Sequence, residues 1–354
     1  MDRKKIIIAS DSWKGSLDSF EVADAMARGF GDACNDFDIT KLYISDGGEG
    51  FTRCINATIG GNLMELSVTG ALGETVCPMV CAIDGKTAVM DVASIVGINL
   101  IAPEERNPWN ASSRGVGMAI NQLCSLGFKH IIIGLGGSVT NDCGLGMIEE
   151  ITCDLSHIRF TIASDVTSPL LGPNGATYMF ARQKGATEKM LEPLERRNRQ
   201  RGEWLEKMCG RKIMDLPGAG SAGGIGCALL ALPNTRMVSG IELLLSLYDF
   251  DSLLSQAALV VTGEGRLDFQ SLMGKAPYGI AMRARAKGIP CIALCGQVDE
   301  RGKDEFDRIF TKTIQASPSH LSIDEMMKPE IAKQNIYLAI KALTSSAKYF
   351  SNSL

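Results

Sequence analysis

The stretch that organises this chain is Ile131-Ile132-Ile133-Gly134-Leu135-Gly136-Gly137-Ser138-Val139-Thr140-Asn141-Asp142-Cys143-Gly144. Its three isoleucines are typical of a buried strand in a parallel sheet. The glycines let backbone N–H groups approach a ligand with no Cβ atom in the way, and the polar residues can cap a helix or hold a metal-bound phosphate. The pattern therefore indicates an anion site, with a strand–helix turn that binds nothing as the alternative.

The same order of strand, polar glycine loop and helix begins the chain. A strand over residues 5–9 ends in Ser10-Asp11-Ser12-Trp13-Lys14-Gly15-Ser16, and a helical stripe follows, with Ser19 as the expected N-cap. A second strand, residues 39–44, ends in Ser45-Asp46-Gly47-Gly48-Glu49-Gly50, although a turn with solvated charges is an alternative there. Doubly wound sheets bind ligands at the carboxyl ends of their strands. The polar residues expected there are Asp11, Lys14, Ser16, Asp46 and Glu49.

Three later loops resemble these two. The strand 160–163 ends in Asp165, and the strand 258–261 ends in Thr262-Gly263-Glu264-Gly265-Arg266-Leu267-Asp268. Gly218-Ala219-Gly220-Ser221-Ala222-Gly223-Gly224 matches G-x-G-x-x-G but follows no strand, so it fails the context of a dinucleotide fingerprint. It precedes an apolar helix and suits an anion, with a close-packed helix end as the alternative. The charged segment 188–208 predicts a helix with a solvated face formed by Glu195, Arg196, Arg197, Arg199 and Arg201.

The middle of the chain has a different pattern of predicted secondary structure from its two ends. Residues 63–93 predict short strands with turns at Gly70–Gly73 and Asp84-Gly85, whereas strands followed by helices return near residue 258. We therefore predict an α/β protein of two domains. One is a discontinuous Rossmann-like parallel-sheet domain, residues 1–63 and 258–354, and the other is an inserted mixed α/β domain, residues 64–257.

Composition excludes several classes of protein. The 354 residues suffice for two domains, and a net charge of −4 gives no sign of a nucleic acid or an anionic membrane as partner. The first residues lack the apolar segment of a signal peptide, and no stretch approaches the roughly 20 apolar residues of a membrane span. The 11 cysteines are scattered without a C-x-x-C pair, as in a reducing cytosol, so we expect a cytoplasmic protein.

The loops that follow strands share one chemistry, because they join glycines to charged side chains: Asp11 and Lys14, Asp46 and Glu49, Asn141 with Asp142, Asp165, and Glu264 with Arg266 and Asp268. Phosphoryl transfer needs backbone donors and cations for the phosphates, carboxylates for Mg²⁺, and a carboxylate for the acceptor hydroxyl. The chain has no Walker A motif and no protein-kinase signature. None of its three histidines lies in a polar loop with a partner, so a Ser–His–Asp mechanism is unsupported. Metal-dependent hydrolysis stays open.

These residues together resemble one family, the type I glycerate kinases, which phosphorylate D-glycerate with ATP and Mg²⁺. The resemblance covers nearly the whole chain and implies two α/β domains, one of them Rossmann-like and discontinuous. The matching blocks, in order, are residues 9–16, 45–50, 134–146, 172–176, 183–187, 216–224 and 261–268 with Gly274-Lys275.

The resemblance implies that residues 11–16, 46–49 and 136–142 line the active site, and together with the later loops they supply our candidate residues. The catalytic candidates are Asp46, Asp11 and Lys14, where either Asp46 or Asp11 is the base for the acceptor hydroxyl. The metal candidates are Asp142 and Asp165, and Lys14 and Arg266 would hold the carboxylate or the phosphates. The candidates for binding D-glycerate are Ser16, Glu49, Arg266 and Asp268. The candidates for binding the nucleotide phosphates are Gly136, Gly137, Ser138, Asn141, Gly220, Ser221 and Gly223.

The chain also departs from the family pattern, most clearly in a short segment between Met147 and Phe160. We therefore keep alternatives beside D-glycerate phosphorylation, for which the resemblance favours 2-phosphoglycerate over 3-phosphoglycerate. One is a catalytically impaired paralogue that binds glycerate or a nucleotide as a sensor. Others are a kinase for a related small sugar acid and a Mg²⁺-dependent phosphatase. The sequence leaves the oligomeric state open, a homodimer included.

Overall fold

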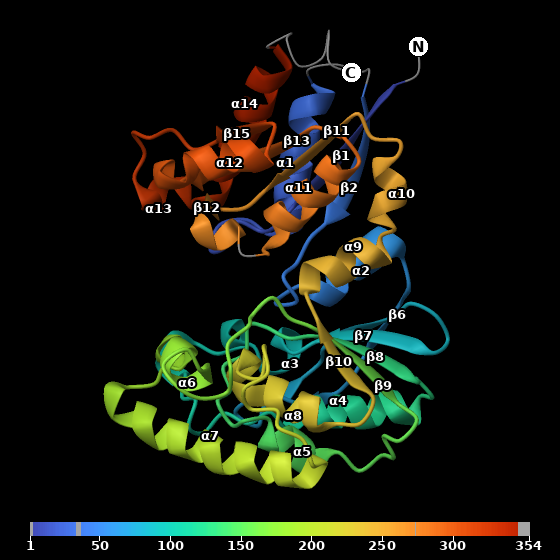
Figure 1. Cartoon of the computed structure of the whole chain (residues 1–354), viewed down its shortest axis with the longest axis vertical. Helices are drawn as coiled ribbons and strands as arrows, with labels where there is room; N and C mark the ends of the chain where they lie inside the picture. The colour runs from blue at the N-terminus through green and yellow to red at the C-terminus, as the bar shows by residue number, and fades with distance from the viewer. Residues whose placement is uncertain (1–2, 33–36, 273, 346–354) are drawn as a thin grey trace. The chain divides into compact units, whose positions relative to one another are not determined.

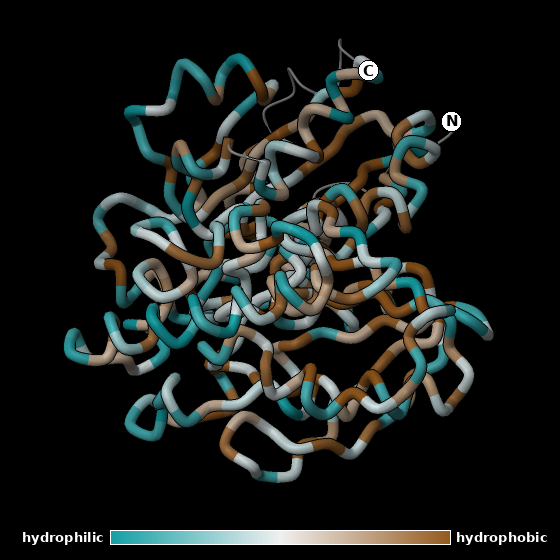
Figure 2. The backbone as a smooth tube through the Cα atoms, turned by 60° about the horizontal axis from the view of Figure 1, so that its bottom comes forward, coloured by the Kyte–Doolittle hydropathy of each residue, from teal (hydrophilic) through white to brown (hydrophobic). Residues whose placement is uncertain are grey.

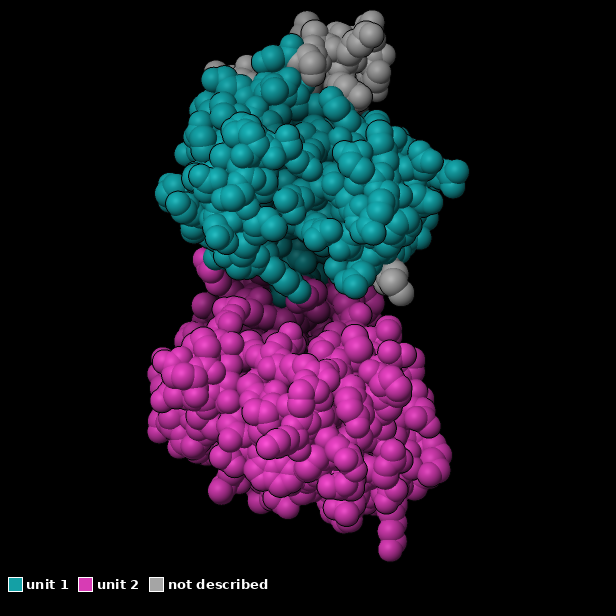
Figure 3. All heavy atoms as spheres, turned by 90° about the vertical axis from the view of Figure 1, so that its left-hand side faces the viewer, with its two compact units in different colours: residues 1–45, 244–354 teal, residues 46–243 magenta. Residues whose placement is uncertain are grey.

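The computed structural model describes residues 3–32, 37–272 and 274–345 and contains two compact units. Unit 1 comprises residues 1–45 and 244–354, and unit 2 comprises residues 46–243 (Figure 3). The units therefore divide after residues 45 and 243, whereas the boundaries expected from sequence lay further along the chain, after residues 63 and 257. Residues 46–63 join unit 2 because helix α2 (Phe51–Ile59) packs against its sheet. At the other boundary, Tyr248 Oη donates a hydrogen bond to Tyr43 O (2.8 Å) in unit 1.

Unit 1 is built on a five-stranded sheet in which every neighbouring pair is parallel. The order across the sheet is β15 (Lys312–Gln315), β13 (Cys291–Cys295), β11 (Leu259–Gly263), β1 (Lys4–Ser10) and β2 (Phe37–Tyr43). Numbered along unit 1, the strands run 2-1-3-4-5, so the direction of winding reverses between β1 and β11. Such a switch point is where an open α/β sheet binds its ligand.

Helices cover both faces of this sheet. Helices α1 (Ser19–Gly31) and α14 (Pro329–Ser345) lie side by side on one face (Figure 1), and α11 (Ala276–Ala286) contacts β11 and β13. The expected N-cap Ser19 is wrong by one residue, because Asp18 caps α1 and Glu21 completes a capping box. The shorter elements of unit 1 are α10 (Phe250–Leu254), β12 (Arg266–Leu267), β14 (Gln297–Val298), α12 (Lys303–Ile309), α13 (Ile323–Met326) and the 3-10 turns Phe269–Leu272 and Glu300–Gly302.

Unit 2 is built on a six-stranded mixed sheet. Its order is β10 (Thr235–Val238), β9 (Arg159–Ala163), β8 (His130–Gly134), β7 (Thr87–Asp91), β6 (Met79–Ala82) and β3 (Asn62–Glu65). Strands β10 to β7 are parallel, whereas β6 and β3 are antiparallel to their neighbours. The β6–β7 hairpin turns at Asp84-Gly85, where Asp84 Oδ1 accepts the N–H groups of Lys86 (2.7 Å) and Thr87 (2.6 Å). The predicted α/β class, a parallel-sheet domain with an inserted mixed domain, is confirmed.

Helices α4 (Arg114–Ser125), α5 (Leu145–Glu150) and α8 (Ile225–Ala231) lie together against one face of this sheet (Figure 1). Their apolar side chains and those of the strands form one buried cluster. In Figure 2 the hydrophilic residues gather on outer loops and helices. The remaining elements are β4 (Val68–Thr69), β5 (Thr75–Val76), α3 (Ala93–Val96), α6 (Ala176–Phe180), α7 (Glu188–Cys209), α9 (Gly240–Leu247) and the 3-10 turns Ile98–Leu100, Pro103–Glu105, Arg182–Lys184 and Ser221–Gly224.

Candidate functional site

The switch point of unit 1 gathers the first set of expected residues. Asp11 N donates to Gly263 O (3.0 Å), so the loop after β1 is fixed to the end of β11. Trp13 and Leu17 pair as a short antiparallel bridge and are buried, which leaves Lys14 at the exposed tip of the loop. Ser16 Oγ is buried and accepts or donates no hydrogen bond among the described residues. An unpaired buried hydroxyl is costly, and a polar ligand would satisfy it.

Glu264 is the buried carboxylate of this switch point. It is 8% exposed, and its Oε1 atom has no hydrogen-bond partner in the described part of the chain. Burial raises the pKa of Glu264, an effect that the nearby charges of Lys275 and Lys14 oppose. The Lys275 Nζ atom lies 3.9 Å from Glu264 Oε2. This arrangement combines a carboxylate with cations and suits a small ligand that carries both a carboxylate and hydroxyl groups.

Asp268 and Arg266, also expected at this switch point, differ in their contacts with other protein groups. Asp268 Oδ1 accepts Gln270 N (2.9 Å), so Asp268 shapes its own turn. Arg266 is 60% exposed, and its Nη2 atom lies 3.8 Å from Asp299 Oδ2. The Arg301 guanidinium holds the pKa of Asp299 down at about 2. Arg266 is therefore an exposed cation at the carboxyl edge of the sheet, as expected for a residue that binds an anion.

Unit 2 presents its own site at the carboxyl ends of β8, β9 and β10. Asp165 follows β9, and its Oδ1 atom accepts hydrogen bonds from Ser239 Oγ (2.7 Å) and Gly240 N (2.8 Å). Its Oδ2 atom is buried without a hydrogen-bond partner among the described residues. Burial raises the pKa of Asp165 to about 6, and the nearby Asp46 carboxylate adds to the rise. A half-satisfied buried carboxylate beside a second acidic group is a candidate cation site.

The Asp46–Glu49 loop lies against the ends of β8 and β9 through its glycines. Gly48 N donates to Asp46 Oδ1 (3.1 Å), which holds the carboxylate over the loop. A Cβ atom on Gly47 would lie 2.6 Å from Ala163 O, and one on Gly136 would lie 2.9 Å from Gly48 Cα. Only glycine permits such close approach, so these glycines are what brings Asp46 next to Asp165.

Asn141 and Asp142, expected to bind phosphate and metal, make hydrogen bonds that organise the loop after β8. Asp142 Oδ2 accepts Ser113 N (2.8 Å), Ser113 Oγ (2.7 Å) and Gly146 N (3.3 Å), while its Oδ1 accepts Gly144 N (3.1 Å). The side chain of Asn141 is buried, and its Oδ1 accepts Asn198 Nδ2 (2.8 Å). The carboxylate of Asp142 is thus occupied by protein donors, which leaves Asp165 as the better metal candidate.

The glycine loop 218–224 packs directly on this segment. Cys143 N donates to Gly223 O (3.0 Å), and Ser221 Oγ lies 3.0 Å from Ser164 Oγ. Gly220 and Ser221 are buried in this contact, so the close-packed alternative fits them better than an open phosphate loop. Gly223 has φ +68°, and a Cβ atom there would lie 1.9 Å from Thr140 O.

We expect Gly223→Ala to destabilise the protein by about 3–5 kcal/mol, since it combines a left-handed backbone with a steric clash. Gly210→Ala is the matched control, because Gly210 has φ +69° but no neighbour within 4 Å of a Cβ atom. That control should cost only about 1–2 kcal/mol. Urea unfolding of both variants measures the difference, and equal losses would show that the loop contact is not tight.

Lys184 is a site residue that the sequence-based assignment missed. It is 4% exposed, and its Nζ atom donates to Ser138 Oγ (3.1 Å) and Thr140 O (2.8 Å). Burial lowers the pKa of Lys184 to about 7, although the charge of Asp142 partly opposes this shift. The available signal was its place in a matching block, Gln183-Lys184-Gly185-Ala186-Thr187. Below about pH 7 this buried lysine on the Gly136–Thr140 loop is positively charged, which suits the place where phosphate was expected.

This lysine should make stability depend on pH. Between pH 7 and its ordinary value of 10.5, the unfolded chain binds a proton that the folded chain lacks, so stability rises with pH. One such proton corresponds to about 1.4 kcal/mol per pH unit. Lys184→Met should remove that slope from unfolding curves taken between pH 7.5 and 9.5, whereas Lys189→Met, at an exposed site, should keep it. Identical slopes in all three proteins would show that burial does not lower the pKa of Lys184.

The solvated face predicted for the charged helix is wrong in part. Arg197 Nη2 donates to Asn141 O (3.0 Å), and Arg201 Nη1 donates to Asp142 O (2.9 Å). The two arginines are four residues apart and so share one face of α7. This face holds the loop after β8, which is a positioning role that the count of charges alone did not reveal.

No group of three or more His, Cys, Asp or Glu side chains in the described ranges is arranged to hold a metal. This does not conflict with Mg²⁺, which is commonly bound by one or two carboxylates together with substrate phosphates and water. The unpaired Oδ2 atom of Asp165 fits that pattern. Among the described helices, none is both long and apolar enough to cross a membrane.

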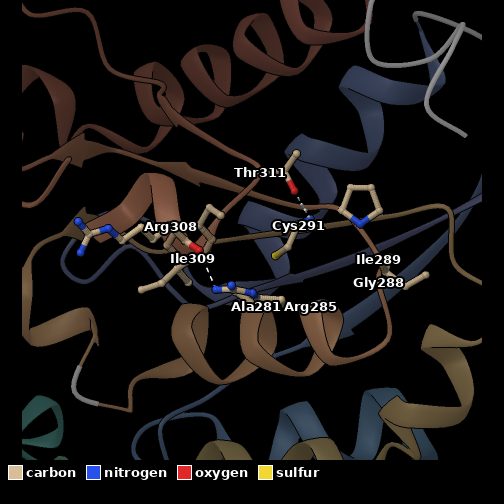
Figure 4. Close-up of a pocket in the computed structure, with 10 residues that line it drawn as sticks. Ala281, Arg285, Gly288, Ile289, Cys291, Arg308, Ile309 and Thr311 are labelled. Atoms are coloured by element: carbon tan, nitrogen blue, oxygen red, sulfur yellow. Dashed lines mark hydrogen bonds between the residues drawn. The ribbon is translucent and has the colours of Figure 1, made fainter. Parts of the chain in front are cut away.

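A separate pocket of unit 1, of about 390 Å³, lies at the opposite edge of its sheet (Figure 4). Cys291 begins β13, and Thr311 precedes β15, so the pocket borders the amino ends of the strands. Arg285 Nη1 donates to Arg308 O (2.8 Å), which engages one of its two arginines. The pocket is therefore distinct from the carboxyl-end loops.

Comparison with known proteins gives a consistent result. A family model described as the glycerate kinase family matches residues 6–156 and 148–347. Glycerate kinase from Bacillus subtilis (strain 168) is 37% identical over 325 residues, covering 83% of this chain and 85% of that protein. Glycerate 2-kinase from Escherichia coli (strain K12) is 36% identical over 327 residues, covering 84% and 86%. A crystal structure assigned as glycerate kinase 2 from Salmonella typhimurium LT2 matches with a TM-score of 0.80 and 30% identity over 98% of both chains.

Proposed function

The chain belongs to the glycerate kinase family, and we propose that it transfers the γ-phosphoryl group of ATP, bound with Mg²⁺, to the 2-hydroxyl group of D-glycerate. The observation that carries the chemistry is the pair of carboxylates, Asp46 and Asp165, beside the glycine loop after β8. Phosphoryl transfer depends mainly on positioning and on neutralising charge, and this pair with its loop is suited to both.

We assign Asp46 as the base that accepts the proton of the attacking hydroxyl, with Asp11 as the second candidate. Asp165 would hold Mg²⁺ through its unpaired Oδ2 atom, and bound Mg²⁺ would neutralise charge on the phosphates. Backbone N–H groups of Gly136–Ser138 are suited to the phosphates, and the nearby Lys184 is an amino group whose charged form a bound phosphate would favour.

Unit 1 supplies the groups that suit D-glycerate. Lys14 and Arg266 are exposed cations for its carboxylate, and Ser16 Oγ and Glu264 Oε1 are buried atoms whose hydrogen-bonding capacity is unused among the described residues. Glu264 replaces Asp268 in this assignment, because Asp268 is engaged in its own turn. Glycerate offers one carboxylate and two hydroxyl groups, which match a set of two cations and two hydrogen-bonding oxygens.

The choice of the 2-hydroxyl rests on the Escherichia coli relative, which is named glycerate 2-kinase. Coupling the products to enolase tests it, because enolase consumes 2-phosphoglycerate directly. We expect a signal with enolase alone. Because enolase itself needs Mg²⁺, the metal requirement is tested separately by quantifying ADP directly in stopped reactions without coupling enzymes, where EDTA should abolish ADP formation and excess Mg²⁺ should restore it. A signal that requires added phosphoglycerate mutase would assign the 3-hydroxyl instead, and activity that survives EDTA would overturn the metal requirement.

We also place the enzyme in the cytoplasm. Every cysteine in the described ranges is a free thiol, namely Cys54, Cys77, Cys81, Cys124, Cys143, Cys153, Cys209, Cys227, Cys291 and Cys295. Free thiols across the described residues are typical of a reducing compartment.

A further inference from the structure

Unit 2 contains a pocket of about 530 Å³ that none of the roles above requires. It lies beyond the carboxyl ends of β7 and β8, where Gly97 and Gly137 form part of its lining. This volume lies within the usual range of roughly 300–1,000 Å³ for small-molecule sites. It greatly exceeds what glycerate, with three carbon atoms, would fill.

The walls of this pocket are apolar side chains from three separate elements. Leu63 in β3, Met79 in β6 and Leu100 at the end of a 3-10 turn line it, with exposures of 48%, 41% and 50%. Scattered exposed apolar residues are ordinary, but three that converge on one concave surface indicate a binding site. The surface suits a flat, largely uncharged group.

Backbone hydrogen bonds connect one wall of the pocket to the glycine loop after β8. Ile98 N donates to Gly137 O (2.8 Å), and Val139 N donates to Val96 O (2.9 Å). The turn that carries Leu100 is thereby fixed beside Gly136–Ser138. A ligand could place an apolar part in the pocket and an anionic part on the loop without either surface having to move.

The charged residues of the pocket also favour a ligand whose uncharged part lies in the pocket and whose anionic part lies on the loop. Glu49 accepts a hydrogen bond from Asn99 Nδ2, and Asp91 accepts Ser94 N (2.8 Å) and Thr52 N (3.3 Å). Both acidic residues line the pocket, and they would repel phosphate from it. The amide of Asn99 and the exposed Arg53 provide polar groups at its edge for ring nitrogens and hydroxyls.

We propose that this pocket binds the nucleoside part of the phosphoryl donor, with its phosphates on the Gly136–Ser138 loop. The inference rests on the proposed function and names the place where the nucleotide binds. It also gives Glu49 a different role from the one expected from sequence, because Glu49 then borders the nucleoside and not D-glycerate.

The test introduces a charge at two of the apolar walls. In Leu63→Asp and Leu100→Asp, we expect the KM for ATP to rise about tenfold or more, because the bound nucleobase would remove water from the new carboxylate. The KM for D-glycerate should stay within about twofold of the wild type. Leu126→Asp is the matched control, since Leu126 is 59% exposed in the same unit and outside the pocket. Leu100→Ala, which only shortens the side chain, replaces any variant whose melting temperature falls.

Calorimetric titration with ADP separates this inference from the proposed function, because it needs no acceptor. Weaker ADP binding in the pocket variants than in Leu126→Asp supports the inference even if the wild type phosphorylates no sugar acid. An active wild type whose pocket variants keep the normal KM for ATP overturns the inference and leaves the function standing. A wild type that neither binds ADP nor turns over overturns both.

Discussion

Asp46→Asn is expected to lower kcat by about 10²- to 10⁴-fold, the usual range for loss of a general base, while the protein stays folded. The asparagine amide cannot accept the proton of the hydroxyl. Its Oδ1 atom can still accept Gly48 N, which lies 3.1 Å from Asp46 Oδ1, so the loop should keep its conformation. Steady-state rates at saturating substrates and a melting curve measure the two effects separately.

Two companion variants give this prediction its control. Asp38→Asn changes an exposed carboxylate in β2 and should leave kcat unchanged. Asp11→Asn tests the second candidate base. A large loss in Asp11→Asn together with near wild-type turnover in Asp46→Asn would transfer the role of base to Asp11.

Asp165→Asn should abolish activity and stabilise the fold at the same time. Because its pKa is about 6 in the folded protein and ordinarily 3.8, the folded chain holds a proton over that interval which the unfolded chain has lost. Stability from this group is fully present below pH 3.8 and is lost as the pH rises through about 6. At neutral pH the ionised carboxylate therefore destabilises the fold, by up to about 3 kcal/mol for a shift of this size.

Urea unfolding of wild type and Asp165→Asn at pH 8 and at pH 4 tests the sign. The variant should be more stable at pH 8, and its advantage should shrink at pH 4. Asp84→Asn serves as the opposite control, because backbone hydrogen bonds from Lys86 and Thr87 hold the pKa of Asp84 below its usual value. That variant should lose stability at pH 8. A less stable Asp165→Asn at pH 8 would contradict the buried, half-satisfied carboxylate.

A trade of stability for activity at Asp165 fits its surroundings. Its Oδ1 atom is fixed by two donors, while the buried Oδ2 atom has no partner among the described residues. Asp142 looks similar in sequence, as an acidic residue in a polar loop after a strand, yet four donors occupy its carboxylate. Only the three-dimensional hydrogen bonds distinguish a carboxylate that holds a loop from one available to a ligand.

The sheets were predictable because their signal is local. Runs such as Ile131-Ile132-Ile133 must be buried on both faces, and the polar loops after them then fall at the carboxyl ends of the strands. The contribution of α7 was not predictable, because charge and periodicity do not say which face of a polar helix meets a neighbour. Arg197 and Arg201 both donate to carbonyl oxygens of a loop more than fifty residues earlier in the chain.

The burial of Lys184 was likewise not predictable from the sequence. A lysine in a polar stretch predicts exposure, and only the packing of its 3-10 turn against the loop after β8 buries its ammonium group. The boundaries between the units depend likewise on tertiary contacts. Helix α2 follows a strand of unit 1 along the chain but packs against β6 and β7 of unit 2.

The most direct test of the central claim is an ADP-release assay with Mg-ATP and a panel of D-glycerate, L-glycerate, tartronate and glycerol. Turnover with D-glycerate alone is the predicted result, and it would show that catalysis does not need the longer segment that the family usually carries between the positions of Met147 and Phe160. Absence of turnover with every acceptor, while D-glycerate still raises the melting temperature, would contradict the account and identify a protein that binds its ligand without phosphorylating it.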